Sequence, residues 1–142
     1  MINKMAIVGF NLTKILVERK DSFDGKLNIN SKINVEDIKK ASMDISKDKE
    51  TLQLNFIFEI SYEPEFAKVI FKGNVLLLLD PKESKEIIRD WKKKKNISDI
   101  NEAVRESIFN IILRKCNIKA FSLEEELNLP MHIPLQIQRN QK

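Results

Sequence analysis

Histidine, cysteine and glycine are scarce in this sequence. Its 142 residues include one histidine, one cysteine and three glycines. One histidine and one cysteine cannot supply the four ligands of a structural zinc site, and three scattered glycines cannot form a phosphate-cradling loop or a dinucleotide fingerprint. The single histidine, His132, has no surrounding catalytic motif, so we expect no metal, no cofactor and no enzymatic activity.

The lone cysteine, Cys116, excludes an internal disulfide framework and suits a reducing compartment, so we expect a cytoplasmic protein with an inert, buried thiol. Long apolar runs are also missing. The longest, Val75 to Leu79, has five residues, against about 20 for a membrane-spanning helix. The apolar run at the N-terminus is too short for a signal-peptide core, and we predict a strand there and no membrane insertion.

The remaining composition is typical of a globular domain. Hydrophobic residues make up 42% and charged residues 32% of the chain, and a chain of this length usually forms one core. We therefore predict a single domain over residues 1–142, with residues 136–142 as a flexible tail. The net charge is +4, and positive charge gathers at Lys92–Lys95, just after Arg89. Such a run is more often a solvated helix end than a nucleic-acid site, which disfavours nucleic acid as a partner.

Alternation of apolar and polar residues predicts a sheet. A break at Glu63–Glu65 separates the two strongest strands and predicts an antiparallel hairpin, while residues 37–44 favour strand and turn over a short helix. Gly73, inside the last strand, indicates a bulge, a close backbone approach or a packing role. The four predicted strands lie around residues 10–17, 27–35, 51–62 and 66–79.

The last two strands carry apolar residues on both faces. Because one helical layer covers only one face of a four-stranded sheet, the second apolar set predicts either burial in an oligomer or a groove for another polypeptide. This second set comprises Ile57, Phe66, Ile70, Leu76 and Leu78.

Helical periodicity begins after Pro81, which suits a first helical turn. Three- and four-residue spacing of apolar residues predicts one helix over residues 82–95 and a second helix after it. Ser98 or Asp99 would cap the second helix, and Asn117 would end it. The apolar positions are Ile87, Ile88 and Trp91 in the first helix and Ile100, Val104, Ile108, Ile111, Ile112 and Cys116 in the second.

The segment from Phe121 to Leu135 contains two prolines, so it cannot form one continuous helix. We predict that it is extended and lies over the domain. Its acidic run, Glu124–Glu126, is typical of a solvated turn or helix start and predicts no cation site.

Several short motifs resemble those of the SecB-type export chaperones. The letters AVRESI at residues 103–108 resemble the start of that family's long helix, and KGNVL at residues 72–76 resembles its glycine-containing last strand. Phe121, LNLP at residues 127–130 and IP at residues 133–134 resemble the segment that the family has after this helix. The resemblance extends over nearly the whole chain.

The resemblance implies an α+β fold, in which a four-stranded antiparallel sheet, an irregular crossover segment and one long packing helix form a subunit of a dimer or a dimer of dimers. It also implies an ATP-independent chaperone that holds unfolded or precursor polypeptides. The positions that correspond to the family's client-binding residues are Trp91, Ile97, Leu127, Leu129, Met131 and Ile133.

The chain also departs from the family. This chain is basic, whereas the export members of the family bind the translocation motor through an acidic sheet surface. The resemblance therefore does not imply that this chain binds the translocation motor. We also expect no second helix after the LNLP motif. Two alternatives stay open: a nucleic-acid-binding module that uses the basic crossover, and a dedicated partner-binding chaperone, for instance one that guards an antitoxin.

Overall fold

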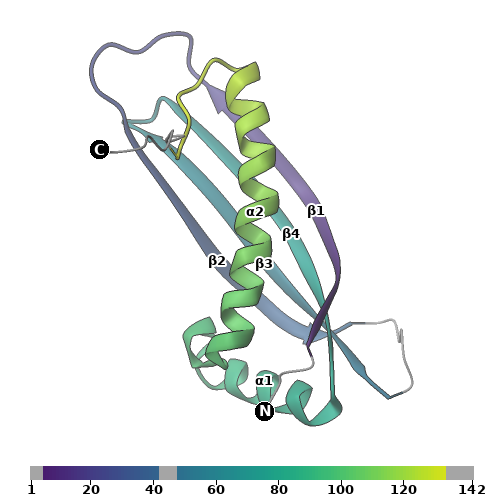
Figure 1. The fold of residues 1–142 in the computed structure, drawn as a ribbon. Coiled ribbons are helices and arrows are strands. Elements are labelled where there is room, and N and C mark those ends of the chain that lie inside the picture. The colour runs from purple at the N-terminus through teal and green to yellow at the C-terminus, as the bar shows by residue number, and fades with distance from the viewer. Residues whose placement is uncertain (1–4, 42–47, 134–142) are drawn as a thin grey trace, which may run out of the picture.

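The computed structural model describes residues 5–41 and 48–133. The four strands form an antiparallel sheet in the order β1-β4-β3-β2, and helix α2 crosses one face of it diagonally (Figure 1). The predicted α+β class, with a four-stranded antiparallel sheet and one long helix, is confirmed. The elements are β1 (Ala6–Arg19), β2 (Asn28–Lys40), β3 (Glu50–Glu63), β4 (Ala67–Leu79), α1 (Pro81–Lys94), the 3-10 turn η1 (Ile97–Asp99) and α2 (Glu102–Glu126).

The central β3–β4 hairpin confirms the predicted alternation. Leu52 pairs with Leu77 and Tyr62 pairs with Ala67, so the even residues of β3 and the odd residues of β4 share the face under α2. All six even residues of β3 from Leu52 to Tyr62 are at most 1% exposed. The strand predicted for residues 37–44 continues to Lys40, and residues 42–47 lie outside the described part of the chain.

Both edge strands are interrupted by bulges. The register of β1 against β4 shifts at Val8 and again at Thr13, and that of β2 against β3 shifts at Glu36. An extra residue bends an edge strand and leaves a break in its ladder, which hinders continuous pairing with another chain.

Gly73 lies at a close approach of β4 to β1. It pairs with Leu12, directly beside the second bulge of β1. A Cβ atom on Gly73 would stand 2.2 Å from the carbonyl oxygen of Asn11 and 3.0 Å from the ring of Phe56. Of the roles considered for this glycine, the structure therefore shows a close backbone approach, with the bulge in the neighbouring strand.

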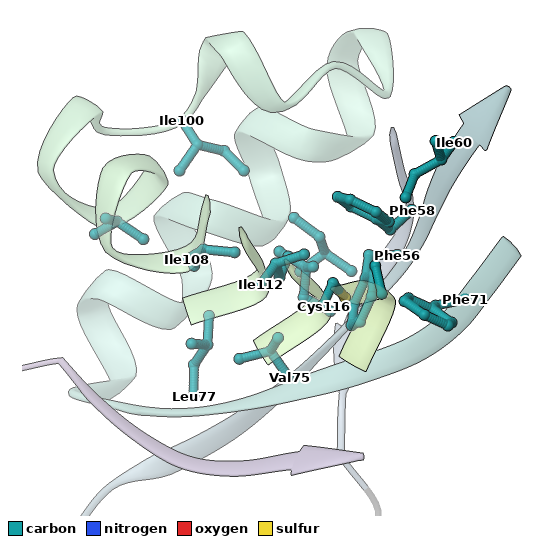
Figure 2. Close-up of a cluster of buried hydrophobic side chains, with 14 of the residues drawn as sticks. Phe56, Phe58, Ile60, Phe71, Val75, Leu77, Ile100, Ile108, Ile112 and Cys116 are labelled. Carbon is teal, nitrogen blue, oxygen red and sulfur yellow. The ribbon is translucent and has the colours of Figure 1, made fainter. Parts of the chain in front are cut away.

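The buried residues of α2 follow one another at intervals of four. Each four-residue step overshoots a full helical turn by about 40°, so the buried line winds around α2 as the helix crosses the twisted sheet. Figure 2 shows the middle of this contact, where Ile108, Ile112 and Cys116 of α2 meet Phe56 and Val75 of the sheet. The buried positions of α2 are Val104, Ile108, Ile112, Cys116, Ala120 and Glu124.

The start of α2 differs from the prediction. Neither Ser98 nor Asp99 caps it, because both belong to the separate turn η1. The cap is Asn101, whose Oδ1 accepts hydrogen bonds from the backbone N–H groups of Ala103 at 2.9 Å and Val104 at 3.3 Å. The crossover between sheet and α2 is therefore not irregular but consists of two regular helical pieces, α1 and η1.

The end of α2 also differs. The helix does not stop near Asn117 but continues to Glu126, so the prediction of an extended segment from Phe121 onward is wrong for its first six residues. The helix ends before the first proline, and Asn128 takes the left-handed conformation with φ 54°. The predicted tail at residues 136–142 lies outside the described residues. Neither α1 nor α2 is long and apolar enough to cross a membrane, and no other described residues form such a helix.

Candidate functional site

The six residues that the family resemblance indicates fall into two groups at opposite ends of α2. Trp91 lies in α1 and Ile97 in η1, before α2 begins, whereas the other four follow its last residue, Glu126. Because α2 has 25 residues and each adds about 1.5 Å, the two groups are separated by roughly 37 Å along the helix. Leu127, Leu129, Met131 and Ile133 lie in one short segment after α2, whereas Trp91 and Ile97 lie before it. Figure 1 shows α1 at the opposite end of α2 from that segment.

The six side chains also differ in burial. Trp91 is 2% exposed and Leu129 is 7% exposed, so both are part of the core. Ile97 and Leu127 are half-buried and pack against it. Met131 and Ile133, at 42% and 40% exposed, offer the largest apolar surface of the six.

A buried polar cluster holds the segment after α2 against the sheet. The Glu124 carboxylate accepts a hydrogen bond from the hydroxyl of Tyr62 on β3 and, at 3.0 Å, another from the backbone N–H of His132. The Nδ1 atom of His132 lies 3.1 Å from Oε1 and 3.0 Å from Oε2 of the same carboxylate. Its Nε2 atom lies 2.7 Å from Oδ1 of Asn117. Because carboxylate oxygens only accept, Nδ1 of His132 is assigned the ring proton, and three donors then converge on one carboxylate, which offsets the cost of burying it.

The cluster corrects one expectation: Glu124 is not solvated, as predicted for the acidic run, but is 1% exposed. The His132 side chain is 0% exposed, which agrees with the prediction that its segment lies over the domain. A general base needs a ring nitrogen facing a substrate, whereas both ring nitrogens of His132 face partners within the protein. The arrangement is therefore suited to holding the segment in place and not to proton transfer.

Tyr62 enters this cluster as a neutral donor. Burial, and then the hydrogen bond and charge of Glu124, raise the pKa of Tyr62 far above the ordinary value of its phenol. The hydroxyl also lies 3.0 Å from the carbonyl oxygen of Pro130, so Tyr62 contacts both α2 and the segment that follows it. Sequence reasoning missed this cluster because Tyr62 lies 62 residues before Glu124 in the chain. The only local signal is that Glu124 continues the four-residue spacing of buried positions in α2.

A second contact holds the same segment nearer the helix. Arg19, at the end of β1, donates from Nη1 to the carbonyl oxygens of Leu127 at 2.8 Å and Asn128 at 3.3 Å. Its guanidinium lies 4.7 Å from the centre of the Phe66 ring. Two open pockets lie beside this contact, one of about 840 Å³ and one of about 540 Å³, and Arg19 and Phe66 line both of them. Leu127 also lines the larger pocket, and Pro130 also lines the smaller one.

The face of the sheet away from α2 is mixed in character. Ile57, Ile70, Leu76 and Leu78 are half-buried on it, as the two-faced pattern predicts. Polar side chains lie among them, including an Asn11–Asn74 hydrogen bond of 3.1 Å and a Lys72–Glu36 ion pair of 4.0 Å. The prediction for Phe66 is wrong: it precedes β4 and is 6% exposed, because it packs into the core with Phe23.

The lone cysteine is an inert core residue. Cys116 is fully buried on α2, and burial raises the pKa of its thiol to about 12. At physiological pH it is therefore a neutral thiol and a poor nucleophile. Within residues 5–41 and 48–133, no group of three or more metal-ligating side chains gathers at one point.

Comparison with known proteins identifies the fold. No protein-family model matches the chain, and no curated protein matches its sequence. Among solved structures, it is similar to a SecB-like chaperone of Mycobacterium tuberculosis that was solved in complex with a ChAD peptide from the HigA1 antitoxin. The match has a TM-score of 0.56 and 13% sequence identity, and covers 95% of this chain and 88% of the other. The four-stranded sheet with its diagonal helix is thus a SecB-like fold.

Proposed function

We propose that this protein is an ATP-independent chaperone, a holdase that binds unfolded or precursor polypeptides and is not an enzyme. The observation that carries the proposal is the exposure of Met131 and Ile133 on a segment held by Glu124 and Arg19. Apolar side chains on a backbone that is already ordered bind with a smaller loss of conformational entropy. Binding of unfolded chains then keeps them soluble by mass action and needs no catalytic residue.

The SecB-like fold supports this proposal, as does the neighbour's complex with a peptide. The proposed primary contact consists of Leu127, Met131 and Ile133, with Leu129 supporting them from the core. The two open pockets beside Leu127 and Pro130 extend the surface along which a client would lie. The proposed place of action is the cytoplasm, where the free thiol of Cys116 would stay reduced.

The test is suppression of aggregation of a reduced, unfolded client without nucleotide. We expect a Met131→Ser, Ile133→Ser double variant to need roughly tenfold more protein for the same suppression, because two exposed apolar contacts contribute about 1.4 kcal/mol or more. The matched control is Ile118→Ser, which removes an apolar side chain that is 65% exposed on α2, outside this segment.

Light scattering on each variant separates loss of binding from loss of assembly. Equal suppression by the double variant and by wild type would contradict the proposed contact, and no suppression by wild type would contradict the holdase itself. The same measurement tests the proposed dimer or dimer of dimers. That assembly is supported by the side chains of Val8 and Ile15, which are 41% and 46% exposed on β1 and could form an apolar contact without continuous strand pairing.

Trp91 belongs to the proposed contact only if α1 moves, because its side chain is 2% exposed. Two features of α1 favour such movement. Among the described residues, neither the Trp91 indole Nε1 nor the Ser84 hydroxyl has a hydrogen-bond partner, and each buried unpaired group costs about 1–3 kcal/mol. Displacing α1 would expose these groups to other partners and recover part of this cost.

Trp91 is the one tryptophan of the chain, so its fluorescence reports on α1 alone. On saturation with an unfolded client that lacks tryptophan, we expect acrylamide to quench Trp91 more strongly, since the close packing around the indole is lost. The Met131→Ser, Ile133→Ser variant at the same client concentration is the control and should show less change. Unchanged quenching with bound client would place Trp91 outside the contact.

A second candidate is a chaperone dedicated to one partner. The neighbour's complex with an antitoxin peptide favours it. A dedicated chaperone would bind one polypeptide in a fixed stoichiometry and would suppress aggregation of unrelated clients poorly, which the assay above measures directly.

A further inference from the structure

One side of α1 carries a basic stripe. Lys85, Ile88, Arg89 and Lys92 follow the helical spacing i, i+3, i+4 and i+7, so they line one face. The buried residues of α1, which include Ile87 and Trp91, lie on the helix face next to this basic stripe. The basic stripe therefore lies at the rim of α1, where the helix meets the sheet.

This stripe forms a groove with the end of the edge strand β2. An open pocket of about 500 Å³ lies there, and five of its six wall residues are cationic. The sixth, Ile88, is half-buried and gives the groove an apolar floor. The wall residues are Lys40, Lys85, Ile88, Arg89, Lys92 and Lys93.

Among the described residues, two of these five cations have a carboxylate within 4.0 Å. Lys40 is paired with Glu50 at 3.6 Å, and Arg89 Nε lies 3.8 Å from Asp90. In the part of the chain that the structure describes, no carboxylate lies within 4.0 Å of the ammonium groups of Lys85, Lys92 or Lys93. The groove therefore combines an unbalanced positive potential with an apolar floor.

We propose that this groove binds an acidic peptide segment that carries an apolar side chain. The carboxylates would contact the lysines, and the apolar side chain would lie on Ile88 between the aliphatic stems of the lysines. The groove lies at the opposite end of α2 from Met131 and Ile133, so it is a second site and does not depend on the proposed holdase function.

Nucleic acid fits the groove less well. Single strands bind by stacking bases on exposed aromatic side chains, but Trp91, next to the stripe in sequence, is buried. The half-buried Ile88 at the floor of the groove offers an apolar contact for a peptide side chain and no ring on which a base could stack.

The test is binding of labelled ten-residue peptides to the full chain, measured by fluorescence anisotropy in about 50 mM and about 300 mM salt. The probe is a peptide rich in aspartate and glutamate with a central leucine. Its controls are the same peptide with alanine for leucine, an uncharged glutamine version, and a single-stranded DNA oligomer of equal charge. We expect the acidic leucine peptide to bind most tightly and to weaken roughly tenfold in the higher salt.

A charge-reversal pair locates the site. Lys85→Glu with Lys92→Glu should weaken the acidic leucine peptide roughly tenfold, whereas Lys115→Glu with Lys119→Glu, on exposed positions of α2, changes net charge equally and should leave binding within about twofold. Equal losses in both pairs would show a net-charge effect and overturn the site. Tighter binding of the DNA oligomer, no preference for leucine over alanine, or no peptide binding in the lower salt would overturn the proposed ligand.

Discussion

Replacing Gly73 with alanine is expected to destabilise the protein by about 3 kcal/mol, a large fraction of the stability of a domain of this size. The added Cβ would stand 2.2 Å from the Asn11 carbonyl oxygen. That oxygen belongs to the backbone of β1, which is paired with β4 on both sides of this point. Relief of the clash therefore requires the two strands to separate, because no flexible side chain can give way.

Gly9 offers a matched control in the same strand pair. The three atoms nearest to a Cβ there all belong to the side chain of Leu76, and the nearest, Cδ1, would be at 3.0 Å. Leu76 is half-buried on the open face and can turn aside, so we expect Gly9→Ala to cost less than about 1 kcal/mol. Urea unfolding of both variants measures the difference. Equal midpoints for Gly73→Ala and wild type would mean that β1 and β4 are not packed this closely.

Replacing Glu124 with glutamine is expected to destabilise the protein by roughly 2–3 kcal/mol. The carboxylate accepts from the Tyr62 hydroxyl and from the backbone and ring of His132. Glutamine has nearly the same shape but places an NH₂ group, a donor, against one or more of these donors. The buried groups would then lack partners, and the segment that carries Met131 would loosen.

Glu125→Gln is the matched control, since Glu125 is the next residue of α2 and its side chain is exposed. Unfolding in urea and limited proteolysis after Leu127 are the measurements. We expect faster cleavage and a lower unfolding free energy for Glu124→Gln, and no change for Glu125→Gln. Identical behaviour of the two variants would show that the cluster does not hold the segment.

The sheet could be predicted from sequence because its evidence is local. Apolar and polar residues alternate regularly over residues 52–62 of β3. If β3 paired with β4 one residue out of register, its core side chains would all turn to the opposite face, so only one pairing register is stable. The end of α2 could not be predicted in this way. Asn117 is a common cap residue, and the buried positions beyond it, Ala120 and Glu124, do not look like core residues. Their burial depends on the sheet beneath them.

The candidate site was predictable only in part. The family resemblance indicated the stretch from Leu127 to Ile133, where Met131 and Ile133 are 42% and 40% exposed, and its role in binding stays a prediction. It gave no sign that Trp91 is a core residue. The partner of Glu124, Tyr62, is 62 residues earlier in the chain, and no local pattern can report a contact over that distance.

Because the buried positions of α2 rotate gradually around the helix, the number of residues in α2 determines which way its last turn faces. Each residue advances the chain by about 1.5 Å and turns it by about 100°. Deleting or inserting one residue in the middle of α2 would therefore rotate the end of the helix by about 100° relative to its start. Val104 would stay against the sheet, but Glu124 would point away from Tyr62. The number of residues in α2 sets the direction in which the terminal segment leaves the helix, and hence which side of the molecule displays Met131 and Ile133.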